Sequence, residues 1–166
     1  MKAIIFGITG QDGSHLADLL LDKGYEVVGV SRQASTDNTQ RIKHLIDIEG
    51  FKLVQGDITD VFSVRNILSE YGDVDEIYNL AAQSHVAVSF KQPALTWDVT
   101  GKGCLHILQT LVDLGLHARF YQASSSEMFG SSYDIDRTQV KYQDENTKFS
   151  PQSPYAISKC AAHYIT

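Results

Sequence analysis

The sequence has few cysteines, no long apolar run and no excess of positive charge. Cys104 and Cys160 are its only cysteines, and both fall in stretches expected to be helical, which predicts buried thiols and indicates no metal site. No window reaches the apolar length that a bilayer requires, and the short apolar start leads into a glycine-rich turn rather than a signal-peptide cleavage site. The net charge of −6 disfavours a broad surface for nucleic acid or anionic membrane. These absences predict a cytoplasmic protein that holds any anionic ligand with local donors.

Short apolar stretches alternate with helical ones along the chain. Strands are expected at residues 2–8, 26–31, 51–55, 76–80 and 119–123. Helices are expected after the turn at 9–14, over 41–49, from an N-cap at 59 or 60 to 71, over 93–114 and over 155–166. This alternation predicts an α/β fold with a doubly wound parallel sheet spanning residues 1–166.

The buried faces of two helices are predicted from the spacing of their leucines. In the first helix, which Gly24 ends, this face comprises Leu16, Leu19 and Leu20. In the long helix, which Gly115 ends, it comprises Leu105, Leu108, Leu111 and Val112. Residues 130–150 are polar and show no clear period, and loops of this length are usually functional or mobile.

The turn after the first expected strand carries three glycines, Gly7, Gly10 and Gly13. A direct turn from strand to helix needs unusual backbone angles, and a pyrophosphate at a helix N-terminus needs backbone without a Cβ in the way. The usual dinucleotide fingerprint is spaced differently, and glycines alone are weak evidence. The flanking strand and helix favour a dinucleotide site over a chance turn. The spacing resembles that of the extended short-chain dehydrogenase/reductases, which implies a Rossmann-type NAD(P)-binding domain.

The residues after the next two strands bear on the choice of dinucleotide. An acidic residue after the second strand favours NAD, whereas a basic one suits the 2′-phosphate of NADP. Arg32, followed by Ser35, therefore favours NADP over the alternative of a solvated surface arginine. Asp57 stands at the end of the third strand, where it could bond the adenine amino group or serve only as a turn carboxylate.

Small residues follow the fourth strand, where a flat cofactor could lie against the backbone, and His85 comes next. A single histidine with no ligand-spaced partner is more often a hydrogen-bonded structural residue than a metal ligand or a base. We therefore expect a structural role for His85.

Four residues are candidates for catalysis. Tyr155 and Lys159 are four apart, so they share a face of the last helix. A phenol has a reference pKa of about 10, and a neighbouring ammonium would favour its phenolate as a base. Ser125 could bond the substrate oxygen that Tyr155 deprotonates, and Glu127 adds a second proton-transfer group. The alternatives are a turn hydroxyl for Ser125 and a solvated loop acid for Glu127.

Four segments together carry a more specific resemblance, namely residues 7–14, 79–86, 120–127 and 153–159. In them the chain resembles the GDP-mannose 4,6-dehydratase family of the extended short-chain dehydrogenase/reductases, over essentially all of its length but only in that family's N-terminal half. The resemblance implies that NADP is held by Gly7, Ile8, Thr9, Gly10, Gln11, Asp12, Gly13, Arg32, Ser35, Asp57, Ile58, Leu80, Ala81, Ala82, Gln83, Ser84, Tyr155 and Lys159.

The resemblance also implies a reaction in nucleotide-sugar metabolism, on the route to GDP-fucose. Tyr155 would act as base on the mannose 4-hydroxyl while a hydride leaves C4 for NADP⁺. Glu127 would remove the C5 proton and assist loss of water from C6, and the hydride would return to C6. The product would be GDP-4-keto-6-deoxymannose, formed by a lyase that is a homo-oligomer in its full-length form.

The chain departs from the family at several positions. Ser125 replaces the usual threonine, Gln33 replaces a second arginine after Arg32, and Leu95 replaces a tyrosine near the cofactor. The loop at 130–151 is longer than usual. The family's C-terminal half, which supplies most of the GDP-sugar pocket, has no counterpart, so the 166-residue chain is expected to be an incomplete domain that is inactive alone.

Two alternatives remain open. The first is another nucleotide-sugar epimerase or reductase, from which Glu127 distinguishes a dehydratase because simple redox at C4 does not need that acid. The second is a non-catalytic NADP-binding module that senses redox state or pairs with another subunit.

Overall fold

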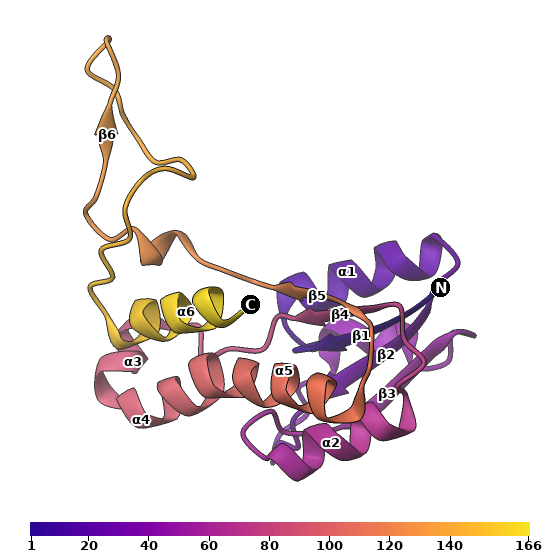
Figure 1. The fold of residues 1–166 in the computed structure, drawn as a ribbon. Coiled ribbons are helices and arrows are strands. Elements are labelled where there is room, and N and C mark those ends of the chain that lie inside the picture. The colour runs from indigo at the N-terminus through magenta and orange to yellow at the C-terminus, as the bar shows by residue number, and fades with distance from the viewer.

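A computed structural model describes residues 1–166 of the chain. Its centre is a five-stranded parallel sheet with the strand order β3-β2-β1-β4-β5 (Figure 1). The strands are β1 (Lys2–Phe6), β2 (Glu26–Ser31), β3 (Phe51–Gln55), β4 (Glu76–Asn79) and β5 (Arg119–Gln122). The predicted doubly wound parallel sheet is confirmed, and each strand lies within two residues of its expected bounds.

Helices cover both faces of the sheet (Figure 1), so alternate residues of β1 belong to different cores. Ala3 and Ile5 pack toward α1 (Gln11–Asp22) and the 3₁₀ helix η1 (Gln40–Leu45), which replaces the longer helix expected over 41–49. Ile4 and Phe6 pack toward the other face, which is covered by α2 (Val61–Glu70) and α5 (Gly103–Leu114). All four side chains are at most 1% exposed, as expected for the middle strand of a parallel sheet.

The predicted buried faces of α1 and α5 are partly wrong. Leu19 is 51% exposed, Leu105 46% and Val112 76%. The residues that α5 buries are Gly103, Cys104, Ile107, Thr110 and Leu111. Small and polar residues on this face let the helix approach its neighbours closely: a Cβ on Gly103 would lie 2.6 Å from Cδ1 of Ile58. Leucine spacing alone does not report such close packing.

The long helix expected over 93–114 is a composite. Its parts are α4 (Pro93–Thr96), the π-helical segment η2 (Trp97–Lys102) and α5. A separate helix, α3 (Val86–Lys91), precedes them. Pro93 begins α4 at its first position and separates it from α3, because a proline disfavours helical backbone at the residue before it; Gln92 has φ −134°. Gly115 has φ 64° and ends α5, as predicted. None of the helices is both long and apolar enough to span a bilayer.

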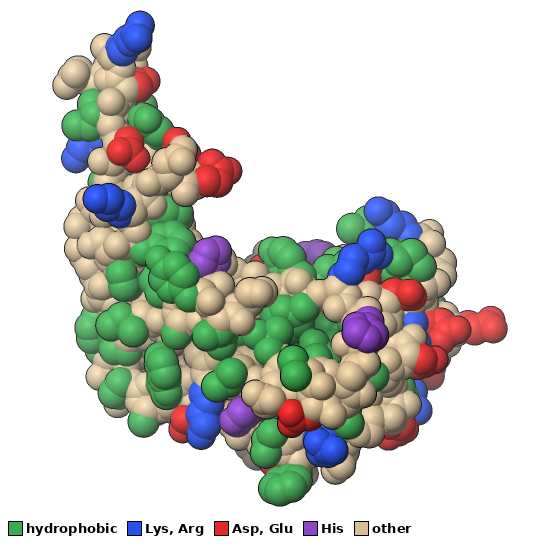
Figure 2. Space-filling view, viewed as in Figure 1, with side chains coloured by type: hydrophobic (Ala, Val, Ile, Leu, Met, Phe, Trp, Pro, Cys, Tyr) green, Lys and Arg blue, Asp and Glu red, His purple; other side chains and the backbone are tan.

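Residues 130–150, expected to be irregular, contain a small antiparallel hairpin of β6 (Asp134–Ile135) and β7 (Lys141–Tyr142). Asp136 holds the turn, since its Oδ1 atom accepts hydrogen bonds from the backbone N–H and the hydroxyl of Thr138 at 2.8 and 2.7 Å. The hairpin stands away from the sheet (Figure 1), and a hollow lies between it and the part of the molecule formed by the sheet (Figure 2).

Candidate active site

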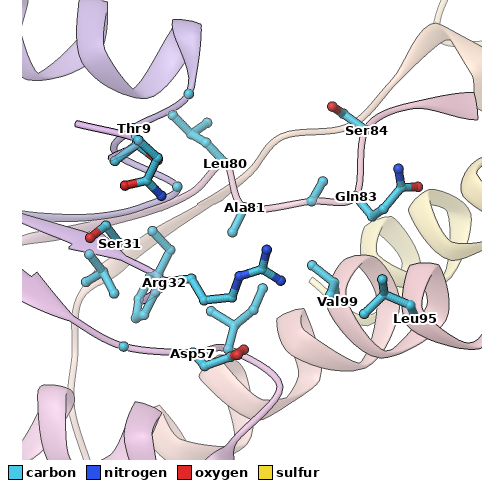
Figure 3. A pocket seen from close by; sticks show the side chains of 18 of the residues that line it. Thr9, Ser31, Arg32, Asp57, Leu80, Ala81, Gln83, Ser84, Leu95 and Val99 are labelled. Carbon is cyan, nitrogen blue, oxygen red and sulfur yellow. The ribbon is translucent and has the colours of Figure 1, made fainter. Parts of the chain in front are cut away.

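A cleft of about 510 Å³ opens at the carboxyl edge of the sheet, lined by the ends of β1 and β2 and the segments that follow β3 and β4 (Figure 3). The strand order reverses at this place, because β2 and β3 lie on one side of β1 and β4 lies on the other. Open α/β sheets bind their ligands at such a switch point. The cleft is therefore where the fold alone predicts a ligand.

The glycine turn forms one wall of the cleft and has no room for side chains. Gly7 has φ +88°, and a Cβ there would lie 2.8 Å from the backbone nitrogen of Ala81. A Cβ on Gly13 would collide with the carbonyl oxygen of Gly7. α1 begins after Gly10 without a side-chain cap, so no side chain occupies the amide groups of its first turn. An anionic group can approach these amides directly.

Polar side chains line the opposite wall. The Arg32 side chain extends into the cleft between Ala81 and Asp57 (Figure 3), and its guanidinium makes no hydrogen bond or ion pair. Oδ1 of Asp57 accepts hydrogen bonds from the backbone N–H and the hydroxyl of Thr59 at 2.8 and 2.7 Å, which leaves Oδ2 free. Ser35 is exposed and does not line the cleft.

Hydrogen bonds fix the segment after β4 against the helices beside it. The backbone N–H of Gln83 donates to the hydroxyl of Thr100 at 3.1 Å, and the hydroxyl of Thr96 donates to the Gln83 side chain at 3.1 Å. The expectation that His85 is a hydrogen-bonded structural residue is wrong. Its ring is exposed, makes no hydrogen bond and borders the cleft.

The structure separates the residues predicted to hold a cofactor into two groups. Those that line the cleft are Gly7, Thr9, Gly10, Arg32, Asp57, Ile58, Leu80, Ala81, Ala82, Gln83 and Ser84. Those that do not are Ile8, Gln11, Asp12, Gly13, Ser35, Tyr155 and Lys159. The Ile8 side chain is fully buried in the core behind the glycine turn. Tyr155 and Lys159 lie in the helix over residues 154–165, which contributes no residue to the lining of the cleft.

Several other residues line the cleft. Leu95, which stands at the family's tyrosine position, is among them. The lining residues that were not predicted from the sequence are Phe6, Val30, Ser31, Asn38, Gly56, His85 and Val99. The first three and Gly56 lie at or next to strand ends, a signal that could have identified them. Val99 lies in η2 and reaches the cleft only through tertiary packing, which no local pattern reports.

The helix α6 (Pro154–Ile165) carries the predicted tyrosine and lysine. Its N-cap is Ser153, whose hydroxyl accepts a hydrogen bond of 3.0 Å from the backbone N–H of Ala156. Tyr155 and Lys159 are 8% and 3% exposed, and Nζ of Lys159 lies 5.9 Å from the centre of the Tyr155 ring. The ammonium is therefore close enough to act on the phenol electrostatically.

Lys159 also connects α6 to the sheet. Its ammonium donates a hydrogen bond of 2.6 Å to the carbonyl oxygen of Ala123, directly after β5. Burial lowers the pKa of Lys159 to about 8, and the nearby Cys104 acts in the opposite direction. Burial raises the pKa of the Cys104 thiol. At neutral pH, Lys159 therefore remains mostly protonated, as a cation with little water around it.

Ser125 is the N-cap of the 3₁₀ turn η3 (Ser126–Met128), which follows β5 and contains Glu127. The hydroxyl of Ser125 accepts a hydrogen bond of 3.2 Å from the backbone N–H of Glu127, whose carboxylate is exposed. Because β5 is parallel to β1, this turn lies at the same edge of the sheet as the glycine turn. α6 packs against η3, so the helix that carries Tyr155 and Lys159 adjoins the turn that carries Ser125 and Glu127.

The chain matches the family model described as GDP-mannose 4,6 dehydratase over residues 4–166. It is 49% identical to a GDP-mannose 4,6-dehydratase of Vibrio cholerae serotype O1, with 99% of this chain and 44% of that protein covered. It is 48% identical to GDP-mannose 4,6 dehydratase 1 of Arabidopsis thaliana, with 99% of this chain and 46% of that protein covered. The chain thus spans less than half the length of the curated relatives it matches.

Solved structures with the same fold include other enzymes that act on nucleotide sugars. DesIV, a dTDP-glucose 4,6-dehydratase from Streptomyces venezuelae solved with NAD and TYD bound, is 28% identical with a TM-score of 0.84, over 99% of this chain and 50% of that one. A UDP-glucose 4-epimerase from Thermus thermophilus in complex with NAD is 27% identical with a TM-score of 0.79, over 99% of this chain and 50% of that one.

Proposed function

The chain belongs to the GDP-mannose 4,6-dehydratase family, and from that premise we propose that it is the cofactor-binding and catalytic part of an enzyme that converts GDP-mannose to GDP-4-keto-6-deoxymannose. The main support for the proposal is the position of α6, whose Lys159 contacts Ala123 at the end of β5 and lies beside the Tyr155 ring. The chain spans less than half of its curated relatives, so the reaction is proposed for the full-length protein.

The proposed cofactor is NADP. The glycine turn has no space for a Cβ, the first turn of α1 has no side-chain cap, and the cleft lies at the switch point, all of which suit a dinucleotide. Bound there, NADP would supply reversible hydride transfer. Arg32, which has no carboxylate partner, would pair with the 2′-phosphate that NAD lacks, and the free Oδ2 of Asp57 would accept a hydrogen bond from the adenine amino group. The relatives solved with NAD support a nicotinamide dinucleotide but not the choice between the two.

The first proposed step is oxidation at C4 of the mannose. Tyr155 would take the proton of the 4-hydroxyl, and the Ser125 hydroxyl would bond the same oxygen. The buried ammonium of Lys159 would stabilise negative charge that develops near the Tyr155 ring during proton transfer, because little water lies nearby to screen its charge. Its hydrogen bond to Ala123 would keep that charge in place during proton transfer.

The second proposed step is elimination, and it depends on Glu127. A ketone at C4 makes the C5 proton acidic, so a carboxylate can remove it. Glu127 would pass this proton to the departing C6 hydroxyl, and water would leave. Return of the hydride to C6, with uptake of a proton at C5, would then complete the 4-keto-6-deoxy product. The exposed carboxylate of Glu127, two residues after Ser125, is compatible with a substrate that enters from outside the sheet. An epimerase or reductase needs no such acid, so Glu127 favours the dehydratase over these alternatives.

Product analysis tests the proposal. Full-length protein supplied with NADP and GDP-mannose should form the 4-keto-6-deoxy sugar by loss of one water, without accumulating reduced cofactor. Tyr155→Phe should abolish turnover, whereas Tyr25→Phe, at the opposite edge of the sheet, should leave it intact. A C4 epimer as the sole product would overturn the proposal.

A separate proposal concerns the isolated 166-residue chain. We propose that it binds NADP but does not turn over GDP-mannose, because about half the length of its relatives has no counterpart in it. Cofactor binding without turnover by the full-length protein would favour the non-catalytic module instead. The homo-oligomer implied by the family resemblance is likewise a proposal for the full-length protein, to be checked by light scattering.

A further inference from the structure

A second side chain of α6 reaches the end of β5, beside the contact made by Lys159. Nδ1 of His163 and the hydroxyl of Ser124 share a hydrogen bond of 3.1 Å, whose direction depends on the imidazole tautomer. His163 follows Lys159 by four residues, so Tyr155, Lys159 and His163 lie along one face of the helix. Nothing in the family resemblance gives His163 or Ser124 a role.

The segment that receives these two contacts directly follows β5. Within residues 1–166, β5 pairs with β4. The last backbone hydrogen bond between them runs from the N–H of Ala123 to the carbonyl oxygen of Asn79, at 3.1 Å. Ser124 lies beyond this bond, and Ser125 and Glu127 follow it. Beyond this ladder, side chains from α6 form hydrogen bonds with Ala123 and Ser124, and the backbone N–H of Ser150 donates one of 2.9 Å to the carbonyl oxygen of Met128 at the far end of the segment.

The imidazole ring is itself held in place by neighbouring aromatic side chains. The Phe149 ring meets it edge-on, with centroids 5.3 Å apart and an interplanar angle of 82°. The Tyr164 ring lies 5.7 Å away at 71°. Phe149 also contacts Phe129, which directly follows η3, at 5.0 Å. Phe149 thus connects the His163 ring to Phe129, the residue directly after the turn that carries Glu127.

We propose that His163 is a positioning residue for the dehydratase reaction. By holding Ser124, it fixes the Ser125 hydroxyl and the Glu127 carboxylate relative to Tyr155. Lys159 holds Ala123 and His163 holds Ser124. These two contacts from one helix set both the position and the orientation of the segment that continues to Glu127. The proposal rests on the proposed function, since it assigns His163 to the same site.

Four variants of the full-length protein test this role. His163→Phe keeps the ring contacts and removes the hydrogen bond, and Ser124→Ala removes the same bond from the other side. His163→Asn places an amide near the position of Nδ1 and should restore the bond. The double variant Ser124→Ala with His163→Phe measures whether the two residues act together. His117→Phe, an exposed histidine with no hydrogen bond, is the matched control.

The expected result is a change in kcat with little change in binding. His163→Phe and Ser124→Ala should each lower kcat about tenfold and leave KM and NADP affinity within about twofold, because misplaced catalytic groups slow the chemical step. The double variant should lose no more than either single one, and His163→Asn should recover most of the rate. Unchanged kcat in His163→Phe, or losses that multiply in the double variant, would overturn the proposal.

A readout without turnover separates this proposal from the proposed function. In the full-length protein, Ser124→Ala should shift the NMR resonances of the His163 ring and leave those of His117 unchanged. If the wild-type protein does not turn over GDP-mannose, the proposed function fails, while a shifted His163 signal still establishes the contact. If turnover is normal and Ser124→Ala leaves the His163 signal and kcat unchanged, the positioning role alone fails.

Discussion

The ammonium of Lys159 donates a hydrogen bond of 2.6 Å to the carbonyl oxygen of Ala123, and this contact joins α6 to the carboxyl end of β5. It places a charged side chain that is 3% exposed beside the Tyr155 ring. A buried cation with a single hydrogen-bond acceptor costs stability, because it has lost most of its hydration. The arrangement is therefore better explained by function than by folding.

The cost of burying Lys159 predicts how stability depends on pH. Burial lowers the pKa of Lys159 from 10.5 to about 8, so between these values the unfolded chain holds a proton that the folded chain has released. The contribution of Lys159 to stability should rise with pH across this window, by up to about 3 kcal/mol. Tyr78 and Cys104, whose pKa values are raised, act in the opposite direction, so the difference between the wild type and Lys159→Met isolates this contribution. Urea unfolding of the cofactor-free protein from pH 7 to pH 11 measures this rise. Lys159→Met should lack it, and identical pH profiles for the two proteins would contradict the assignment.

Gly7 should tolerate alanine much less well than another glycine of similar backbone conformation. Gly24 has φ +77° and nothing within 4 Å of the position that an added methyl group would take, so Gly24→Ala should cost only the backbone strain, about 1 kcal/mol. Gly7→Ala adds a collision with the backbone of Ala81 and should cost about 3 kcal/mol. Denaturant midpoints and NADP titration check both effects. Equal costs for the two substitutions would show that the tight approach of Gly7 to Ala81 is unimportant.

Arg32 should distinguish the two dinucleotides. Arg32→Ala removes the proposed partner of the 2′-phosphate, so NADP affinity should fall about tenfold or more while NAD affinity stays within about twofold. Arg65→Ala, on the exposed side of α2, is the matched control and should change neither. Fluorescence titration with both cofactors measures the ratio. A parallel loss for NADP and NAD would mean that Arg32 does not contact the 2′-phosphate.

Glu127 should be needed for elimination but not for the first oxidation. Glu127→Gln keeps the size of the side chain and removes its basicity, so the variant should reduce cofactor in a single turnover and then stop. In deuterated water it should incorporate no deuterium at C5, and overall kcat should fall about a hundredfold or more. Glu145→Gln, in the exposed stretch after the hairpin, is the control. Normal product formation by Glu127→Gln would remove this residue from the mechanism.

The strands could be predicted from the sequence because burial in a parallel sheet selects short apolar runs. The bounds of β2 and β3 match their expected ranges. The buried face of α5 could not be predicted in the same way, since it is made by Gly103, Cys104 and Thr110 as much as by leucines. The hairpin was missed because its strands are two residues each and its turn depends on the side chain of Asp136.

For the candidate site too, local patterns could be predicted from the sequence and contacts between distant segments could not. The glycine turn and the Tyr155 and Lys159 pair are local patterns, and a sequence displays local patterns directly. The exposure of His85, the approach of Val99 to the cleft and the bond between Ser124 and His163 depend on how distant segments pack, so no spacing indicates them. The expectation for His85 failed for this reason.

The proposed function requires that the hydride removed from C4 of the mannose returns to C6 within one site. Supplying the full-length protein with GDP-mannose deuterated at C4 and following the label by NMR tests this transfer. We expect deuterium in the C6 methyl group of the keto sugar, with none released to water. Label retained at C4 of an epimerised sugar, or lost to solvent, would contradict it.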